Sequence, residues 1–327
     1  MEGFIDTVNS VIWSNWLVYL CLGAGAYFTL ATLFLQIRCF PDMIRQLKSG
    51  ESSDQGISSF QSLMISLAGR VGVGNIAGVA TAIAFGGPGA VFWMWLVALL
   101  GSATSFIECC LAQIYKETDR DTGEYRGGPA YYIEKTYKHT AAKPFMLVYA
   151  IIFAVCMLLA TSYFLPGIQA NGVAAAVDNA WGVNVWISAT IMAIMLAFII
   201  IGGVKRIATF ASMVVPFMAG IYIIIAIVVL FANASQIPEV FGTIVRAAFD
   251  KEAAFSGMLG AAIMWGVKRG IYSNEAGQGT GPQSAAAAEV SHPAKQGFVQ
   301  AFAVYVDTLF VLSLIHISEP TRLRRIS

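Results

Sequence analysis

Two glycine-rich segments interrupt apolar stretches of this chain and carry many of the side chains that could bind a small polar ligand. The segment Arg269–Pro282 (RGIYSNEAGQGTGP) contains four glycines, an asparagine, a glutamate and a glutamine. The segment Ala68–Gly78 (AGRVGVGNIAG) interrupts a second apolar stretch. Glycine costs about 1 kcal/mol in a helix interior relative to alanine, so both segments predict a helix that opens. In hydrocarbon, such backbone survives only where it is buried in protein or lines a cavity.

The glycine-rich segment Ala68–Gly78 could bind a carboxylate. A helical half is predicted to begin near Asn75, and a helix begins with free N–H groups and the positive end of its dipole. Gly72 and Gly74 allow the backbone to approach a ligand closely, because no Cβ intervenes. We therefore expect Gly72, Val73, Gly74 and Asn75 to bind a small substrate. The alternative is that the glycines only allow close packing of helices.

The second glycine-rich segment offers oxygen atoms to a cation. A helical half is predicted to end near Tyr272, which leaves carbonyl groups free beside the side chains of Ser273 and Asn274. Such oxygens accept from an ammonium group or bind Na⁺ in broken transporter helices. Gly277 and Gln278 are expected to border the same substrate, and a side chain at Gly277 is expected to intrude on it.

Ionisable side chains inside apolar stretches are hypotheses for function by default. Glu275 has Arg70 or Lys268 as a candidate partner, and either a direct role with a cation or a structural ion pair would explain it. Asp307 lies in the middle of a later apolar stretch, whereas Glu108 lies near the end of its own and is expected to reach the interface. The candidates for cation coupling are Asn75, Asn274, Glu275 and Asp307.

Composition identifies these segments as parts of an all-α polytopic membrane protein. The chain is 57% hydrophobic and 12% charged, whereas soluble domains carry about 25% charged residues. A spanning helix needs about 20 apolar residues, which predicts about eight spans. They are 16–37, 60–86 (broken), 88–115, 144–174, 184–203, 207–232, 256–288 (broken) and 297–317. Two amphipathic stretches, Gly127–Tyr137 and 237–248, are expected along an interface.

Other classes of function find little support in the sequence. The net charge of +1 argues against a nucleic-acid surface. The three histidines, His139, His292 and His316, are scattered, so no enzyme constellation, structural metal site or bound cofactor is expected. An ion channel is the weaker alternative, because channels usually repeat one filter around an oligomer axis, whereas here two different broken helices share one chain.

The charges of the loops predict an orientation in the bilayer. Lysine and arginine gather in the loops after the first, third, fifth and seventh spans, which places these loops in the cytoplasm and the N-terminus outside. The basic cluster near the end of the chain breaks this alternation. We therefore expect residues 315–327 to be a non-native tail; a genuine short polar tail is the alternative.

Three motifs resemble the alanine or glycine:cation symporter family. They are Gly69–Gly78 (GRVGVGNIAG), Tyr125–Tyr131 (YRGGPAY) and Lys268–Gly279 (KRGIYSNEAGQG). The resemblance covers the chain up to about Leu314. It implies a transporter of the prokaryotic inner membrane that couples uptake of alanine or glycine to Na⁺, sometimes to H⁺, by alternating access. It also implies a leucine-transporter-like fold, in which an extra N-terminal helix precedes two inverted repeats of five helices and the first helix of each repeat is unwound.

On that fold, residues 1–314 form one transmembrane domain. Residues 57–232 would be the first repeat and residues 252–314 two helices of the second, so the chain is expected to be truncated. A non-functional fragment of a symporter is therefore an alternative. Gln169 lies late in a span that packs against the broken helices in this fold, and it either binds the substrate or makes an interhelical contact. The sequence leaves open alanine or glycine, the L or D form, Na⁺ or H⁺, and the oligomeric state.

Overall fold

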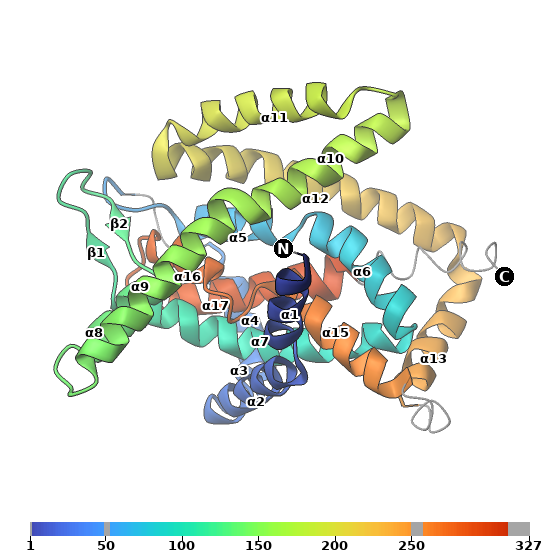
Figure 1. Cartoon of the computed structure of the whole chain (residues 1–327), viewed down its shortest axis with the longest axis horizontal. Helices are drawn as coiled ribbons and strands as arrows, with labels where there is room; N and C mark the ends of the chain where they lie inside the picture. Colours follow the sequence, from blue (N-terminus) through green and yellow to red (C-terminus); the bar gives the residue numbers. More distant parts are fainter. Residues whose placement is uncertain (1, 49–52, 250–257, 313–327) are drawn as a thin grey trace.

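The computed structural model describes residues 2–48, 53–249 and 258–312, and within these ranges the chain is mostly helical (Figure 1). The expected tail at 315–327 and the expected end of the domain at 314 lie outside the described residues. The helices of the first half are α1 (Glu2–Ile12), α2 (Asn15–Ala31), α3 (Leu35–Arg38), α4 (Phe40–Gln46), α5 (Ser59–Arg70), α6 (Val73–Gly86), α7 (Gly89–Ile114) and α8 (Pro129–Thr136). Those of the second half are α9 (Lys143–Leu159), α10 (Leu165–Trp181), α11 (Val185–Ile200), α12 (Gly203–Ala232), α13 (Ile237–Ala248), α15 (Met258–Asn274), α16 (Thr280–Ala286) and α17 (Pro293–Val304). Strands β1 (Glu117–Thr118) and β2 (Tyr125–Arg126) pair antiparallel.

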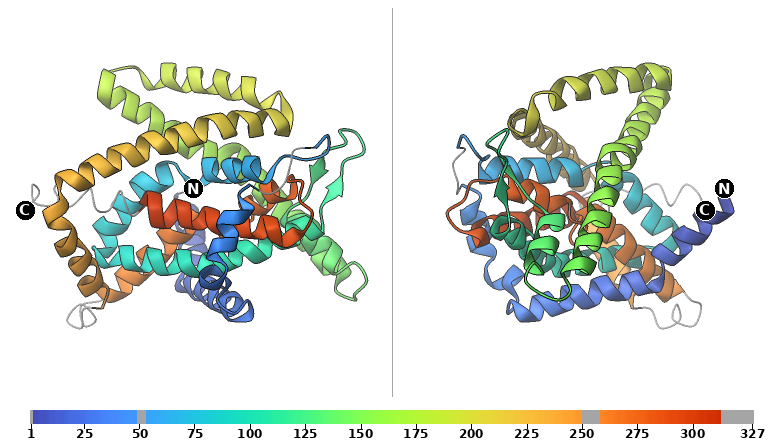
Figure 2. Two further views of the ribbon diagram at one scale, coloured as in Figure 1. Left: turned by 180° about the vertical axis from the view of Figure 1, so that it is seen from behind. Right: turned by 60° about the vertical axis from the view of Figure 1, so that its left-hand side comes forward.

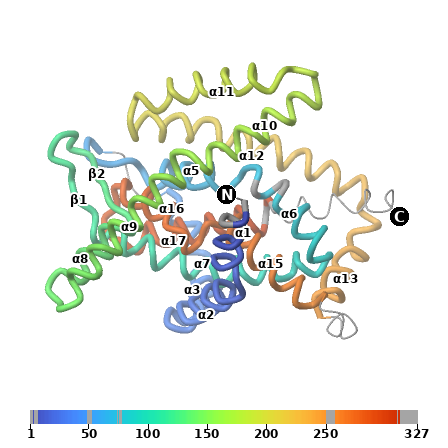
Figure 3. Tube along the Cα trace, viewed as in Figure 1, coloured from blue at the N-terminus to red at the C-terminus, as the bar shows by residue number. Residues whose placement is uncertain are grey.

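Both predicted helix breaks are present. The first separates α5 from α6 at residues 71–72, and the second separates α15 from α16 at residues 275–279. The chain changes direction between α5 and α6, as the trace in Figure 3 shows. A capping box starts α5, because the Ser58 hydroxyl accepts from the Gln61 N–H and the Gln61 side chain accepts from the Ser58 N–H. This reciprocal cap satisfies two N–H groups that no helical carbonyl reaches.

Helix α7 is the element against which the broken helices pack. Helices α2, α13, α15, α16 and α17 all contact it, and the ribbon views show α15 and α17 beside it (Figure 2). Its buried face carries small residues, among them Gly89, Ala98, Ser102, Ser105 and Ala112. Small residues let helix backbones approach closely, which is how helices associate where water is excluded.

Four helical stretches among the described residues are long and apolar enough to cross a membrane. They are Thr7–Ala31, Gly89–Ile114, Lys143–Trp181 and Gly203–Ala232. Helices α10, α11 and α12 extend away from α7 (Figures 1 and 2). Large apolar side chains cover these three helices, and Trp181, Ile194, Ile224 and Phe231 are between 63% and 79% exposed. Apolar surface on this scale suits contact with lipid, so the chain is built as a polytopic membrane protein.

Several predicted boundaries shift in the structure. The predicted span 16–37 ends as α2 at Ala31, because Leu33 and Phe34 adopt left-handed backbone and turn the chain into α3. The predicted span 144–174 continues through π-helical turns at Ala160–Phe164 to Trp181. The last predicted span, 297–317, begins as α17 and changes to π-helical turns at Tyr305–Leu312. Both stretches expected along an interface are helical, as α8 and α13.

A group of contacts that we call the clasp ties the start of α5 to the end of α16 and to the strand hairpin. It consists of Ile57, Lys116, Tyr125, Ala288 and Glu289. Ile57 and Ala288 form a parallel bridge. Lys116 Nζ donates to the Ala288 carbonyl (2.8 Å) and lies 3.7 Å from the centre of the Tyr125 ring. The Tyr125 hydroxyl donates to Glu289 Oε2 (2.9 Å). Burial raises the pKa of Tyr125, and the hydrogen bond and charge of Glu289 raise it further, so its hydroxyl remains a donor at neutral pH.

The substitution Tyr125→Phe should weaken the clasp slightly. It keeps the ring beneath Lys116 and removes the hydroxyl that donates to Glu289, and a partly exposed hydrogen bond of this kind is worth about 1 kcal/mol. We expect the purified protein to melt about 2 °C lower, as measured by intrinsic fluorescence. Tyr163→Phe is the control, since Tyr163 is 72% exposed and its hydroxyl has no hydrogen bond within the described residues. An unchanged Tm for Tyr125→Phe would show that the hydroxyl contributes nothing to the clasp.

Candidate functional site

At the first break, the side-chain amide of Gln169 accepts a hydrogen bond from the N-terminus of α6. Gly72, in extended backbone, precedes the helix, and the Val73 N–H donates to Gln169 Oε1 (2.9 Å). The predicted helix start near Asn75 is therefore two residues late. A Cβ built on Gly72 would lie 2.6 Å from Gln169 Nε2, so the absence of a side chain at Gly72 is what admits Gln169. Gly74 lies in the first turn of α6.

The second break is a short segment of left-handed backbone. Helix α15 ends at Asn274, two residues later than predicted, and α16 begins at Thr280. Glu275, Gly277 and Gly279 have φ of +54°, +84° and +90°. Glycine adopts such values freely, whereas a glutamate there is strained and must be held by its contacts. The Thr280 hydroxyl provides one of them, because it donates to Glu275 Oε2 (2.6 Å).

The two breaks meet at a buried acid, Asp307. Its carboxylate accepts from the Asn75 amide of α6, from the Ser273 hydroxyl of α15 (2.9 Å) and from the Thr308 hydroxyl (2.9 Å). The Ser273 hydroxyl also lies 2.8 Å from Asn75 Oδ1. Asn75, Asp307 and Thr308 are fully buried and Ser273 is 1% exposed. We call these four residues the Asp307 cluster.

The Asp307 cluster has the composition of a site for a hard cation. It combines one carboxylate, one amide oxygen and two hydroxyl oxygens, and oxygen ligands are the ones that Na⁺ uses in broken transporter helices. Asp307 and Thr308 belong to the π-helical turns at Tyr305–Leu312, and π-helical turns are frequent at functional sites. Thr308 was not among the predicted residues; its position next to a mid-span acid was the available signal.

The structure separates the other predicted cation candidates from this cluster. Asn274 is fully buried, but its Oδ1 accepts from the Ala276 N–H (2.9 Å) and its Nδ2 has no partner within the described residues. Glu275 faces Thr280 instead of Asp307. Of the four predicted candidates, Asn75 and Asp307 therefore lie together, whereas Asn274 and Glu275 do not join them.

Neither candidate partner forms a close ion pair with Glu275. Among the described residues, no ion pair within 4.0 Å includes either Arg70 or Lys268. Arg70 is 2% exposed, and its guanidinium donates weakly to the Gln300 carbonyl (3.4 Å) and to the Ser105 hydroxyl (3.5 Å). The positive charge of Arg70 is thus held at the end of α5, directly before the first break.

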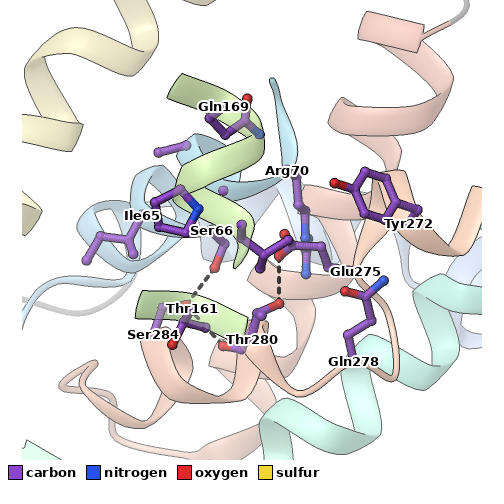
Figure 4. Close-up of a pocket in the computed structure, with 15 residues that line it drawn as sticks. Ile65, Ser66, Arg70, Thr161, Gln169, Tyr272, Glu275, Gln278, Thr280 and Ser284 are labelled. Carbon is purple, nitrogen blue, oxygen red and sulfur yellow. Dashed lines mark hydrogen bonds between the residues drawn. The ribbon is translucent and has the colours of Figure 1, made fainter. Parts of the chain in front are cut away.

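A cavity of about 290 Å³ lies between α5, α10 and the second break (Figure 4). Its polar lining includes Arg70, Gln169, Tyr272, Glu275, Gln278 and Thr280. Gln278 also donates from Nε2 to the Ile271 carbonyl (3.0 Å), at the end of α15. The volume lies at the small end of ligand pockets, and the lining offers both donors and acceptors to a polar small molecule.

Glu108 is the residue that the sequence placed wrongly. It was expected to reach the interface, but it is 7% exposed, and its Oε1 accepts from the Gly277 N–H (3.2 Å) in the second break. The contact at Gly277 also differs from the expectation. A Cβ there would meet Thr104 at an ordinary 3.5 Å, so the left-handed backbone is the reason for glycine at this position.

Comparison with known proteins agrees with the motifs quoted above. The profile of the sodium:alanine symporter family matches residues 1–317. The chain is 54% identical over 313 residues to the putative sodium/proton-dependent alanine carrier protein YrbD of Bacillus subtilis, covering 96% of this chain and 63% of that protein. It is 46% identical to the probable sodium/glutamine symporter GlnT of Bacillus subtilis (95% of this chain, 64% of that protein) and 42% identical to the sodium/alanine symporter AgcS of Methanococcus maripaludis (95% and 68%).

The chain therefore spans 63% and 64% of the lengths of the first two relatives. The family profile nevertheless covers residues 1–317, a range that includes both breaks and the Asp307 cluster. A family profile that matches nearly every residue, together with relatives above 40% identity, makes the assignment plain. The chain belongs to the sodium:alanine symporter family.

Proposed function

We propose that this protein is a secondary active transporter that imports alanine or glycine together with Na⁺ or H⁺ by alternating access. The observation that carries the proposal is the Asp307 cluster, in which a buried carboxylate joins side chains from both broken helices. A cation bound there would stabilise the arrangement of both breaks at once. The names of two relatives, a putative sodium/proton-dependent alanine carrier and a sodium/alanine symporter, support alanine as the substrate and Na⁺ or H⁺ as the cation.

The oxygen atoms of the Asp307 cluster support Na⁺ as the proposed coupling cation. The oxygen atoms of the cluster belong to Asn75, Ser273, Asp307 and Thr308. In this structure the Asn75 amide nitrogen and the two hydroxyl groups donate hydrogen bonds within the cluster. A monovalent cation would replace these hydrogen bonds with contacts to the same oxygens and would neutralise the carboxylate. Neutralising a charge at membrane depth removes a large desolvation cost, which gives the cluster a reason to bind a cation together with the substrate.

The start of α6 is the proposed seat of the substrate carboxylate. The Val73 N–H points at an oxygen of Gln169, and an amide oxygen there occupies the place of a carboxylate oxygen at a helix N-terminus. In the proposed bound state the substrate carboxylate accepts from this N–H, and Gln169 turns to hydrogen-bond the substrate. Ser273, Asn274, Gly277 and Gln278 then border the ammonium group and the small side chain.

The proposed architecture follows the leucine-transporter type. Residues 57–232 form the first repeat and residues 252–314 belong to the second, within one domain of residues 1–314. Two helices broken at matching places, which meet at Asp307, support inverted repeats with a shared site. We place the protein in the prokaryotic inner membrane with its N-terminus outside, on the distribution of lysine and arginine in the loops.

Transport into proteoliposomes tests the function. The complete gene product is reconstituted, and uptake of labelled alanine is measured under an inward Na⁺ gradient, an inward H⁺ gradient and no gradient. We expect concentrative uptake under the Na⁺ gradient, with excess glycine as a competitor. Competition by D-alanine and by glutamine reports stereochemical and side-chain specificity; glutamine is included because a relative is named for it.

Two outcomes would contradict the proposal. A cation conductance that needs no amino acid would identify a channel, and a protein that inserts into the vesicles but moves neither alanine nor glycine would not be a symporter for them. Uptake driven by the H⁺ gradient alone would keep the transporter and replace Na⁺ by H⁺ as the coupling ion.

A further inference from the structure

Glu108 is a buried carboxylate that the proposed transport cycle does not use. It lies on α7, and its neighbours on the buried face, Ser105, Cys109 and Ala112, are fully buried. No ion pair within 4.0 Å includes it among the described residues. An acid in such a position is costly, so its contacts with the rest of the site need an explanation.

The hydrogen bonds of the second break supply that explanation. The Glu275 N–H donates to the Ile271 carbonyl (3.0 Å), the Ala276 N–H to Asn274 Oδ1 (2.9 Å) and the Gln278 N–H to the Glu275 carbonyl (3.1 Å). All three acceptors belong to the break or to the end of α15. The Gly277 N–H instead donates to Glu108 Oε1 (3.2 Å), on a different helix. The orientation of the segment relative to α7 therefore depends on Glu108.

The same face of α7 also limits the segment sterically. A Cβ at Gly101 would lie 3.1 Å from the Ala276 Cβ, and a Cβ at Gly277 would lie 3.5 Å from Thr104 Cγ2. Gly101, Thr104 and Glu108 follow one another at spacings of three and four residues, which places them on one face of the helix. The segment thus rests on this face, and Glu108 is the group that hydrogen-bonds to its backbone.

We propose that Glu108 is a positioning residue for the binding site: its carboxylate fixes the segment 275–279 through the Gly277 N–H and thereby sets the affinity for the transported amino acid and its cation. The residues directly before this segment are Ser273, a member of the Asp307 cluster, and Asn274. A rotation of the segment would move both. Glu108 itself touches neither proposed ligand, and the inference rests on the proposed function for its effect on affinity.

Helix α7 also contacts the end of α5 close to Glu108. Arg70 is anchored to Ser105, one turn before Glu108 on α7. Helix α7 therefore contacts both breaks within one turn, the end of α5 through Ser105 and the second break through Glu108.

The test compares three variants of the purified protein. Glu108→Gln keeps a carbonyl oxygen of nearly the same reach, Glu108→Leu removes the acceptor, and Gln113→Leu is the matched control. Gln113 lies on the same helix, is 6% exposed and donates to the carbonyls of Ala285 and Ala288. It therefore also contacts the second broken helix, but at residues that follow the break. Amide hydrogen exchange of the peptide covering 275–279, Tm and the affinities for Na⁺ and alanine are measured for each.

We expect Glu108→Leu to speed exchange at 275–279 by up to about tenfold, and to weaken alanine and Na⁺ binding by a similar factor, because the Gly277 N–H loses its hydrogen-bond acceptor. Glu108→Gln should restore both to within about threefold of the wild type, since an amide oxygen still accepts. Gln113→Leu should lower Tm without a local change at 275–279. A structural role alone would not produce this separation.

The outcomes decide between positioning and general stability. Wild-type exchange at 275–279 in a folded Glu108→Leu protein would overturn the proposal, as would an equal acceleration in Gln113→Leu. If Glu108→Leu does not fold, Glu108→Asp replaces it, because the shorter acid keeps the charge without reaching Gly277, and the same results are expected. Failure of the wild type to bind alanine would reject the proposed function and the effect on affinity, whereas the exchange result would still decide whether Glu108 holds the segment.

Discussion

Replacing Asp307 by alanine is expected to abolish Na⁺-dependent alanine binding. The carboxylate accepts from Asn75, Ser273 and Thr308 in a fully buried position. Its loss removes the negative charge that would attract the cation and leaves three donors without their acceptor. The unpaired donors lower the stability of the protein, whereas the affinity for Na⁺ falls because the cation loses the one carboxylate of the cluster. A contact with a charged group is worth about 1.5–3 kcal/mol or more, which corresponds to a loss of affinity of roughly 10- to 100-fold or more. Calorimetric titration of the purified protein with alanine at several Na⁺ concentrations measures the loss.

Two further variants show which property of Asp307 matters. Asp307→Asn keeps the shape and one acceptor but removes the charge, and it should bind Na⁺ nearly as poorly as the alanine variant. Thr308→Val removes one hydroxyl oxygen from the cluster and should weaken Na⁺ binding by about tenfold or less. A folded Asp307→Ala protein with the Na⁺ dependence of the wild type would exclude the Asp307 cluster as the cation site.

The substitution Gly72→Val is expected to abolish alanine uptake while the protein still inserts into the membrane. A Cβ at this position would lie 2.6 Å from Gln169 Nε2 and 2.8 Å from Gln169 Oε1, closer than real Cβ contacts. The added side chain would push Gln169 off the Val73 N–H and fill the proposed seat of the carboxylate. The φ of −161° at Gly72 is open to any residue, so the expected effect is steric and comes from the contact with Gln169. Uptake by proteoliposomes and protein yield after membrane extraction are the measurements.

Helix α10 provides the matched control. Gly167 lies two residues before Gln169 on the same helix, and a Cβ there would meet nothing within 4 Å, so Gly167→Val should transport like the wild type. The double variant Gly72→Val with Gln169→Ala removes the clashing side chain and should regain thermal stability but not uptake. Normal uptake by Gly72→Val would remove the start of α6 from the substrate site.

The positions of the two breaks could be predicted because helix breaking is a local property. Four glycines in Arg269–Pro282 and the glycines of Ala68–Gly78 oppose helix regardless of what packs around them. The observed helix ends, Arg70 and Asn274, and the start at Val73 fall within a few residues of the predicted ones. The apolar runs likewise predicted long lipid-facing helices such as α12, since burial in hydrocarbon requires only length and composition.

The grouping of polar side chains around the breaks was decided by tertiary structure. Asn75 and Asp307 are separated by 232 residues and Glu108 and Gly277 by 169, and no local rule relates residues so far apart. Chain spacing also placed Asn274 and Glu275 beside Ser273, yet they face elsewhere, because α15 ends at Asn274 and the backbone turns left-handed at Glu275. The rotation of each helix about its axis decides which polar atoms face one another, and that rotation is set by packing against α7. The sequence by itself therefore determined the family, the apolar helices and the places where two of them open. Only the packing of α6, α15 and the turns at Tyr305–Leu312 decided which oxygen atoms surround Asp307, and only the packing on α7 decided that Glu108 accepts from the Gly277 N–H.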